Sequence, residues 1–289
     1  MDTDRFKGYL CILAAAVMWG FIGPLGKTAC SQDILPMEVA FWRALLAWFC
    51  FAGEVLLRKK NIRIARGDLA PLALFSVLCV TLFYWAYQVA VDQGGAALAS
   101  VLLYTAPAWV ILLSGIFLAE KATADKLLAL VLTISGVVLI AVSQSGENSG
   151  TGGEGLGLGI LAGLFSGFCY SLYYILGKFF SAKYSAGLLF FYTLLPGALL
   201  MLPWIDFADK SPTAWLSLIL LATVSTYGAY HFYYTGLKYI EAGRASIVAT
   251  LEPVVAGLAA WYWWGEFFTA PGYAGAGLVI GAVLLVMRK

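Results

Sequence analysis

Charged residues are scarce in this chain, and their scarcity excludes a soluble globular domain. Only 12% of the 289 residues are Asp, Glu, Lys or Arg, whereas 62% are hydrophobic; soluble domains average about 25% and about 45–50%. The hydrophobic residues occur in runs of about 20, the length of helix that crosses a hydrocarbon core of about 30 Å. The composition therefore predicts an all-α, polytopic membrane protein.

Histidine and cysteine are also rare, which excludes several kinds of chemistry. The single histidine cannot form a metal cluster, and the five cysteines show neither metal-ligand spacing nor the even number of a disulfide framework. No G-x-x-x-x-G-K-[ST] sequence offers a nucleotide cradle, which argues against ATP-driven pumping. The basic residues lie in loops rather than along a stripe, so no nucleic-acid partner is expected. We expect no metal, no cofactor and no enzyme active site.

An internal repeat organises the residues that are present. The segment from Ala96 to Thr123 (AALASVLLYTAPAWVILLSGIFLAEKAT) recurs from Ala242 to Thr269 (AGRASIVATLEPVVAGLAAWYWWGEFFT), at a constant offset of 146. Each copy has a proline near its middle and a glutamate, Glu120 or Glu266, near its end. We expect each glutamate to stabilise the N-terminus of the helix that follows it. The repeat predicts two halves of similar fold.

Ten membrane spans follow from the apolar runs. Their predicted ranges are Gly8 to Thr28, Pro36 to Leu57, Leu69 to Val91, Ala96 to Leu118, Ala124 to Ser143, Gly155 to Lys178, Ala186 to Ile205, Ala214 to Leu237, Ala242 to Trp264 and Ala270 to Met287. Because each half has an odd number of spans, the halves enter the membrane from opposite sides, as in secondary transporters with inverted repeats. We expect residues 1–145 and 155–289 to form the halves and residues 146–154 to be a flexible external linker.

The distribution of basic residues predicts the orientation in the membrane. If the N-terminus is cytoplasmic, 15 of the 18 Lys and Arg residues fall on the cytoplasmic side, which is the usual bias. Both termini are therefore expected to be cytoplasmic. The expected setting is the lipid bilayer of the cell (inner) membrane, and both a monomer and a homodimer remain open.

Motifs spread over the whole chain carry a family resemblance. They are Trp19-Gly20 in the first span, Phe41-Trp42-Arg43 in the second, A-L-A-S…P…L-A-E in the fourth and R-A-S…L-E-P…W-G-E in the ninth. In order and spacing these motifs resemble the EamA type of the drug/metabolite transporter (DMT) superfamily. The resemblance implies a ten-helix inverted-repeat fold with both ends in the cytoplasm. It also implies transport: members mostly export amino acids or other small metabolites, while some import compounds such as choline.

Pro107 and Pro253 occupy matching positions in the fourth and ninth spans. Proline has no amide hydrogen, so neither residue can donate to the carbonyl four residues earlier, and each span has a weak point near mid-membrane. We expect the two prolines to shape a central cavity and to act as hinges. A kink that only improves packing is the alternative.

Two charged side chains are predicted to lie inside the membrane. Glu252 is ten residues into the ninth span, and Arg43 is seven residues into the second. A charge at such depth costs about 2.5–3.5 kcal/mol unless it faces a cavity or finds a partner. Glu252 is therefore a candidate to bind a substrate ammonium group or a coupled proton; the alternative is a protonated acid that is hydrogen-bonded to a neighbouring helix. Arg43 is a candidate either to hold a substrate carboxylate or to lock helices together.

Aromatic residues gather in the middle of a few spans. In the eighth span Tyr227, Tyr230, His231 and Tyr234 recur at helical spacing, and their polar groups need partners that lipid does not offer. In the family that the chain resembles, spans three, four, six, eight and nine line the cavity. The predicted substrate-binding residues are therefore Trp19, Tyr84, Tyr87, Tyr104, Trp109, Tyr170, Tyr227, Tyr230, His231, Tyr234 and Glu252.

An aromatic cavity wall suits two substrate classes. It binds aromatic groups by stacking and ammonium groups by cation–π contact. We therefore predict a secondary active transporter, an exporter of amino acids or related small metabolites that works by alternating access, with a coupled proton as an open option. The alternative is an importer of an organic cation such as choline.

Overall fold

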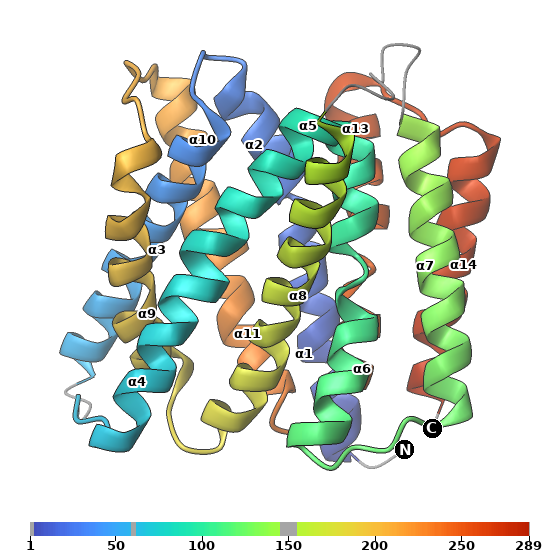
Figure 1. The fold of residues 1–289 in the computed structure, drawn as a ribbon, viewed down its shortest axis with the longest axis horizontal. Helices are drawn as coiled ribbons and strands as arrows, with labels where there is room; N and C mark the ends of the chain where they lie inside the picture. Colours follow the sequence, from blue (N-terminus) through green and yellow to red (C-terminus); the bar gives the residue numbers. More distant parts are fainter. Residues whose placement is uncertain (1–2, 59–61, 145–154, 289) are drawn as a thin grey trace.

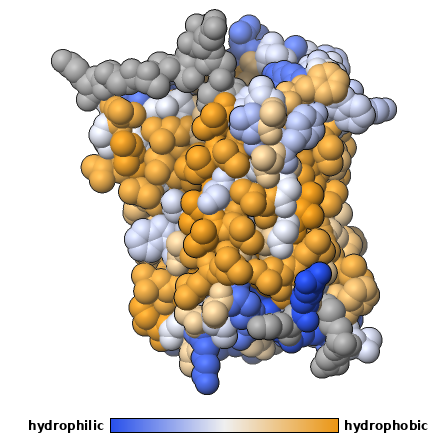
Figure 2. All heavy atoms as spheres, turned by 90° about the vertical axis from the view of Figure 1, so that its right-hand side faces the viewer, coloured by the Kyte–Doolittle hydropathy of each residue, from blue (hydrophilic) through white to orange (hydrophobic). Residues whose placement is uncertain are grey.

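The computed structural model describes residues 3–58, 62–144 and 155–288, which are mostly helical. The predicted linker, 146–154, lies outside the described residues. The first helix, α1 (Thr3–Gly20), begins on the side of the bundle where the last, α14 (Ala270–Met287), ends (Figure 1). We call this side the terminal face and the other side the opposite face. Figure 2 shows an apolar band around the middle, with hydrophilic residues above and below it.

Helices also make up most of the chain between α1 and α14. In the first half they are α2 (Ile22–Cys30), α3 (Pro36–Leu57), α4 (Arg66–Phe75), the π-helix η1 (Ser76–Leu82), α5 (Phe83–Leu103), α6 (Ala106–Phe117) and α7 (Ala124–Gln144). In the second half they are α8 (Leu156–Ser181), α9 (Ala186–Met201), the 3₁₀ helix η2 (Leu202–Trp204), α10 (Pro212–Ala222), the π-helix η3 (Thr223–Gly228), α11 (Ala229–Gly236), α12 (Ala242–Ala249) and α13 (Glu252–Trp264).

The predicted spans are present, although two of them are joined. In the part of the chain that the structure describes, nine helical stretches are long and apolar enough to cross a membrane. One stretch, Arg66–Leu103, contains 38 residues and combines the third predicted span with the start of the fourth. Gly95 separates them, since its φ of 82° interrupts the helix. The short apolar helix α6 then completes the fourth span. The second predicted span coincides with α3.

The second half repeats the order of the spans of the first in the opposite orientation, although the first span is divided into α1 and α2 whereas the sixth, α8, is continuous. A π-helical turn interrupts the third span at η1 and the eighth at η3. The fourth and ninth spans each consist of two helical segments, α5–α6 and α12–α13. The final helix of the first half, α7, begins at the terminal face, whereas α14 ends there (Figure 1). This inversion agrees with the expectation from the repeated sequence and the odd number of spans.

The fourth and ninth spans are broken rather than bent. Residues 104–105 separate α5 from α6, and residues 250–251 separate α12 from α13. Pro107 and Pro253 each lie within the first two positions of the new helix, where the missing amide hydrogen has no intrahelical partner to lose. Each break therefore lies just before the proline, and the proline starts the second segment.

The two final helices, α7 and α14, pack with their backbones in close contact. A Cβ atom added at Gly275 would lie 2.4 Å from the carbonyl oxygen of Gly136, and one added at Gly136 would lie 2.7 Å from the carbonyl oxygen of Gly275. Small residues at helix crossings allow this approach in membranes, where association depends on van der Waals packing.

The close contact predicts that Gly275→Ala lowers thermal stability in detergent. The added methyl group must push the helices apart, at a cost of about 1–3 kcal/mol for overpacking. Gly281→Ala is the matched control on the same helix, because a Cβ atom there meets no other atom within 4 Å. It should leave the unfolding midpoint unchanged or raise it, since alanine favours helix. Equal midpoints for the two variants would contradict the prediction.

Candidate functional site

A cavity of about 250 Å³ lies in the bundle between the two halves. Helices of both halves contribute to its wall, α1, α2, α3 and α5 from the first and α8, α11 and α13 from the second. The lining residues are Trp19, Gly20, Ile22, Gly23, Arg43, Phe83, Tyr84, Tyr87, Ser100, Leu103, Tyr104, Tyr170, Tyr173, Tyr230, Glu252, Pro253 and Ala256. Seven of the predicted substrate-binding residues are among them, together with Arg43 and Pro253. We call this space the central cavity.

Glu252 places a carboxyl group in the cavity wall. It is the first residue of α13, directly after the break at residues 250–251, so the helix dipole favours its negative charge. Tyr104, from the matching break in the first half, and Arg43 line the same cavity as Glu252. The two helix breaks thus meet at the central cavity and place an acid there.

Arg43 brings the opposite charge to the same cavity. Its side chain is 9% exposed, and its Nε donates a hydrogen bond of 2.9 Å to Oγ1 of Thr226. The guanidinium carbon also lies 5.4 Å from the centre of the Tyr84 ring, within the range of a cation–π contact. The bond to Thr226 ties α3 to the π-helix η3, as the helix-locking alternative predicted, while the cavity wall includes the same guanidinium.

Aromatic rings form the floor of the central cavity on its terminal-face side. The ring of Tyr230 stacks on Phe190 at 4.2 Å between centroids and on Tyr173 at 5.8 Å. Trp19 meets Tyr230 edge to face at 6.0 Å and packs against Tyr233 at 5.1 Å. These rings are almost fully buried.

A second chamber extends from the central cavity toward the opposite face. Its volume is about 420 Å³, and five residues line both spaces: Ile22, Gly23, Arg43, Tyr84 and Tyr87. The rest of its wall includes Lys27 and Cys30 near the end of α2 and Pro36 at the start of α3, all at the opposite face. In this structure the site is therefore approached from the opposite face.

Some predicted site residues lie outside the cavity wall. Trp109, on α6, packs edge to face against Phe168 at 5.6 Å, and Pro107 is buried beside it. Tyr227, His231 and Tyr234 are also outside the lining of the central cavity. The predicted stripe divides because neighbouring positions on a helix differ by about 100°, so Tyr230 and His231 face different sides of α11.

His231 instead belongs to a polar cluster near the terminal face. Its Nε2 lies 2.6 Å from Oε2 of Glu54, whose side chain is 3% exposed, and the Tyr227 hydroxyl lies 3.4 Å from the same oxygen. Arg58 is 3.3 Å from the other carboxylate oxygen. A separate pocket of about 120 Å³ includes Glu54, Arg58, His231 and Tyr234. The cluster ties α3 to α11.

Sequence reasoning missed several of the residues at these sites. Phe83 and Tyr173 belong to aromatic clusters that were visible in the sequence, and Ser100 is one of the identical positions of the repeat. Those signals could have identified them. Glu54 gave no such signal, because an acid near the end of a span usually lies at the membrane surface.

Comparison with known proteins places this geometry among transporters. An uncharacterized transporter of Archaeoglobus fulgidus is 31% identical over 286 residues, covering 98% of this chain and 97% of the relative. The uncharacterized inner membrane transporter YicL of Salmonella typhimurium is 25% identical, covering 99% and 96%. A probable terminal-alkyne amino-acid exporter of Streptantibioticus cattleyicolor is 27% identical, covering 82% and 78%.

The fold is also found in a solved crystal structure. That structure has a TM-score of 0.84 to this chain at 14% sequence identity and covers 97% of this chain and 96% of its own. The EamA-like transporter family matches the chain twice, over residues 6–142 and over residues 157–288. Each match covers one of the two halves seen in the structure. The chain belongs to the EamA-like transporter family.

Proposed function

We propose that the protein is a secondary active exporter of amino acids or related small metabolites. The observation that carries this proposal is the presence of both Glu252 and Arg43 in the wall of the central cavity. An amino acid carries an ammonium group and a carboxylate, which are the complements of these two side chains. Charge-assisted hydrogen bonds of this kind are stronger than neutral ones, and the desolvated setting increases their effect.

The volume and wall of the central cavity suit a solute of this class. A cavity of about 250 Å³ holds several water molecules and therefore has room for a small solute. The aromatic rings of Trp19, Tyr84 and Tyr170 offer faces for an apolar side chain. The relative named as a probable terminal-alkyne amino-acid exporter supports the same substrate class.

The proposed mechanism is alternating access by the two inverted halves, 1–145 and 155–289. We assign both chain termini to the cytoplasm of the cell (inner) membrane, which makes the opposite face external. A proton bound at Glu252 is the proposed coupling ion, and the proposal holds for a monomer or a homodimer. Pro107 and Pro253 would act as hinges, since each begins the second segment of a broken span.

An importer of an organic cation such as choline is the second candidate. The aromatic wall and Glu252 would attract a quaternary ammonium group. The Arg43 guanidinium in the same wall opposes a ligand that carries only positive charge. It favours a zwitterion, which supports the amino-acid assignment over the cation importer.

The paired charges predict a switch of ligand selectivity in binding. Purified protein would be tested by thermal shift with phenylalanine, phenethylamine and 3-phenylpropanoate, which share a ring and differ in charge. Phenylalanine should stabilise the wild type most, by about 2.7 kcal/mol at 100 times its Kd. Glu252→Gln should weaken phenethylamine binding, and Arg43→Gln should weaken 3-phenylpropanoate binding, each about 10- to 150-fold for the loss of a charged hydrogen bond.

Thr226→Val is the matched control for the arginine variant. It removes the hydrogen bond to Arg43 Nε without removing the positive charge, so the preference for the carboxylate ligand should remain. Equal loss of all three ligands in both charge variants would reject the paired-charge site. Stabilisation by choline and not by phenylalanine would support the second candidate instead.

The cavity wall predicts different effects for two half-buried aromatic residues. Tyr87 lines both chambers, whereas Trp109 packs against Phe168 outside them. Tyr87→Ala should therefore weaken binding of the best ligand by about 0.5–2 kcal/mol. Trp109→Ala should leave the Kd unchanged although it also removes a large ring. Isothermal titration of both variants checks this, and an unchanged Kd for Tyr87→Ala would remove it from the site.

Proton coupling at Glu252 predicts substrate-driven proton movement in liposomes. A pH-sensitive dye inside the liposomes should report it for the wild type and not for Glu252→Gln, measured at substrate concentrations that saturate the variant. His231→Gln should keep it, because His231 faces the separate pocket with Glu54. If the proton movement is lost in His231→Gln and kept in Glu252→Gln, the proton-coupling site would instead be the Glu54–His231 pair.

A further inference from the structure

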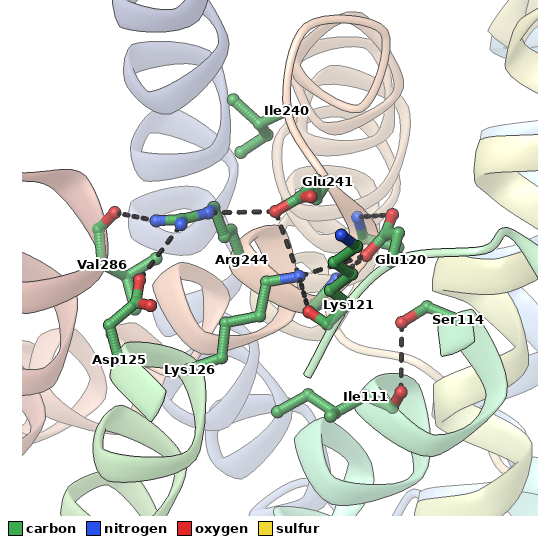
Figure 3. A network of polar contacts seen from close by, with 12 residues as sticks. Ile111, Ser114, Glu120, Lys121, Asp125, Lys126, Ile240, Glu241, Arg244 and Val286 are labelled. Carbon is green, nitrogen blue, oxygen red and sulfur yellow. Dashed lines mark hydrogen bonds and ion pairs between the residues drawn. The ribbon is translucent and has the colours of Figure 1, made fainter. Parts of the chain in front are cut away.

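Glu120 joins the two halves at the terminal face. It lies in the loop between α6 and α7, and its carboxylate accepts hydrogen bonds from the amides of Ala242 (2.7 Å) and Gly243 (3.1 Å). These are the first two residues of α12, whose amides have no intrahelical partner. Glu120 was expected to stabilise the helix that follows it, α7, yet it caps a helix of the other half. Figure 3 shows this carboxylate within a network of polar contacts.

Ion pairs surround this cap. Lys126 lies 3.0 Å from Glu241 and 3.9 Å from Glu120, and Arg244 lies 3.0 Å from both Glu241 and Asp125 (Figure 3). Burial alone would raise the pKa of Glu241, but hydrogen bonds from Lys126 and Arg244 hold that pKa below its ordinary value. Glu241 is therefore ionised at neutral pH, and the ion pairs link α7 of the first half to α12 of the second.

Lys178 binds the end of the neighbouring helix, α11, on the same face. Its Nζ donates to the carbonyl oxygens of Leu237 and Ile240, which follow the end of α11. Glu120 and Lys178 thus bind the two ends of one corner, residues 237–243, between α11 and α12. Within this corner Leu237, Ala242 and Gly243 are buried, and all of α12 is buried as well.

The repeat places the same two residue types at the opposite face. Lys27 corresponds to Lys178 at an offset of 151, and Glu266 corresponds to Glu120 at an offset of 146. There the lysine and the glutamate bind each other, with Nζ 2.5 Å from Oε1 and both side chains 54% exposed. The corner that corresponds to 237–243 is 91–97, and its residues are half-buried or exposed.

Matching turns present the two glutamates. Ala119 (φ 54°) precedes Glu120, and Gly265 (φ 67°) precedes Glu266. The amide of Glu120 donates to the carbonyl of Ser114 at 3.1 Å, and that of Glu266 donates to the carbonyl of Ala260 at 3.5 Å. Left-handed geometry is strained for alanine, yet the first half adopts it. The two carboxylates therefore follow turns of the same geometry and differ only in their binding partners.

We propose that Glu120 and Glu266 are positioning residues that exchange partners as the protein alternates. When the terminal face is closed, Glu120 and Lys178 bind corner 237–243 while Glu266 and Lys27 bind each other. When the opposite face closes, Glu266 caps the amides of Ala96 and Ala97. Lys27 then binds the carbonyls at the end of the helical segment that precedes corner 91–97, and Glu120 pairs with Lys178. The inference rests on the alternating access of the proposed function and goes beyond it.

The proposed exchange of partners is tested by measuring from which face of the membrane the central cavity is accessible. A single cysteine at Ser100, which lines the cavity, is introduced after the five native cysteines are replaced, with thermal stability checked. A membrane-impermeant maleimide is applied to vesicles of either orientation, and the ratio of labelling rates from the opposite and terminal faces is measured. The ratio is insensitive to the fraction of protein that has folded.

Loss of Glu120 and loss of Glu266 should change this ratio of labelling rates in opposite directions. Glu120→Gln removes the charge and one of the two acceptor oxygens that cap α12 at the closed terminal face, and should lower the ratio by up to about 30-fold, the upper limit for the loss of a whole helix cap. Glu266→Gln should raise it, and Glu120→Gln combined with Glu266→Gln should return it toward the starting value. A purely structural role would not give this reversal. An unchanged ratio, or changes in the same direction, would overturn the exchange.

The labelling experiment separates this inference from the assigned substrate. It uses no substrate, so failure of phenylalanine and its analogues to bind would leave a shifted ratio intact and reject only the amino-acid proposal. Binding of phenylalanine together with an unshifted ratio in both variants would reject the exchange and leave the substrate assignment standing.

Discussion

Backbone hydrogen bonding is the constraint on which this fold depends, because lipid offers no partner for a free amide or carbonyl group. Broken helices are tolerated in a membrane only where their ends are buried in protein or face a polar space. Residues flanking both breaks, among them Leu103, Tyr104, Glu252 and Pro253, line the central cavity. The same requirement acts near the terminal face, where Glu120 binds the free amides of α12. The positions of the cavity and of the closed face both follow from where the helices are interrupted.

The π-helical turns create the same need for hydrogen-bond partners within single spans. A π turn leaves carbonyl groups outside the regular ladder, and threonine hydroxyls of the same span donate to them: Thr226 donates to the carbonyl of Leu221 at 2.9 Å, and Thr81 donates to the carbonyl of Ser76 at 3.4 Å. In η3 the same threonine oxygen receives the hydrogen bond of Arg43. The irregular turn thereby fixes the guanidinium that lines the cavity. π-Turns are frequent at functional sites, and this one links helix geometry directly to the charge of the site.

The spans and the principal charges could be predicted because each rests on a large local cost. Apolar runs of membrane length have few alternatives to transmembrane helices, and a charge such as Glu252 or Arg43 inside a span must find a cavity or a partner. The inverted arrangement of the halves followed from the repeat and the odd number of spans. These features needed no knowledge of which helices are neighbours.

The rotation of each helix could not be predicted in the same way. Where a span is apolar all round, periodicity groups residues onto faces but does not show which face meets the cavity. Tyr230 and His231 therefore separated, and Trp109 turned toward Phe168. The partner of Glu120 was missed for a related reason: α12 begins 122 residues away in the sequence, so only the fold brings the carboxylate to it.

The repeat equivalent of Glu252 is Ala106, and this single difference has an evolutionary consequence. The chain contains two similar halves, yet the acid in the wall of the central cavity comes from one of them alone. Under the proposed function, a substitution at position 252 therefore alters which solutes bind while the paired helices, breaks and turns of the two halves stay unchanged. The substrate range of such a protein can then change during evolution without changes in the helices that alternate.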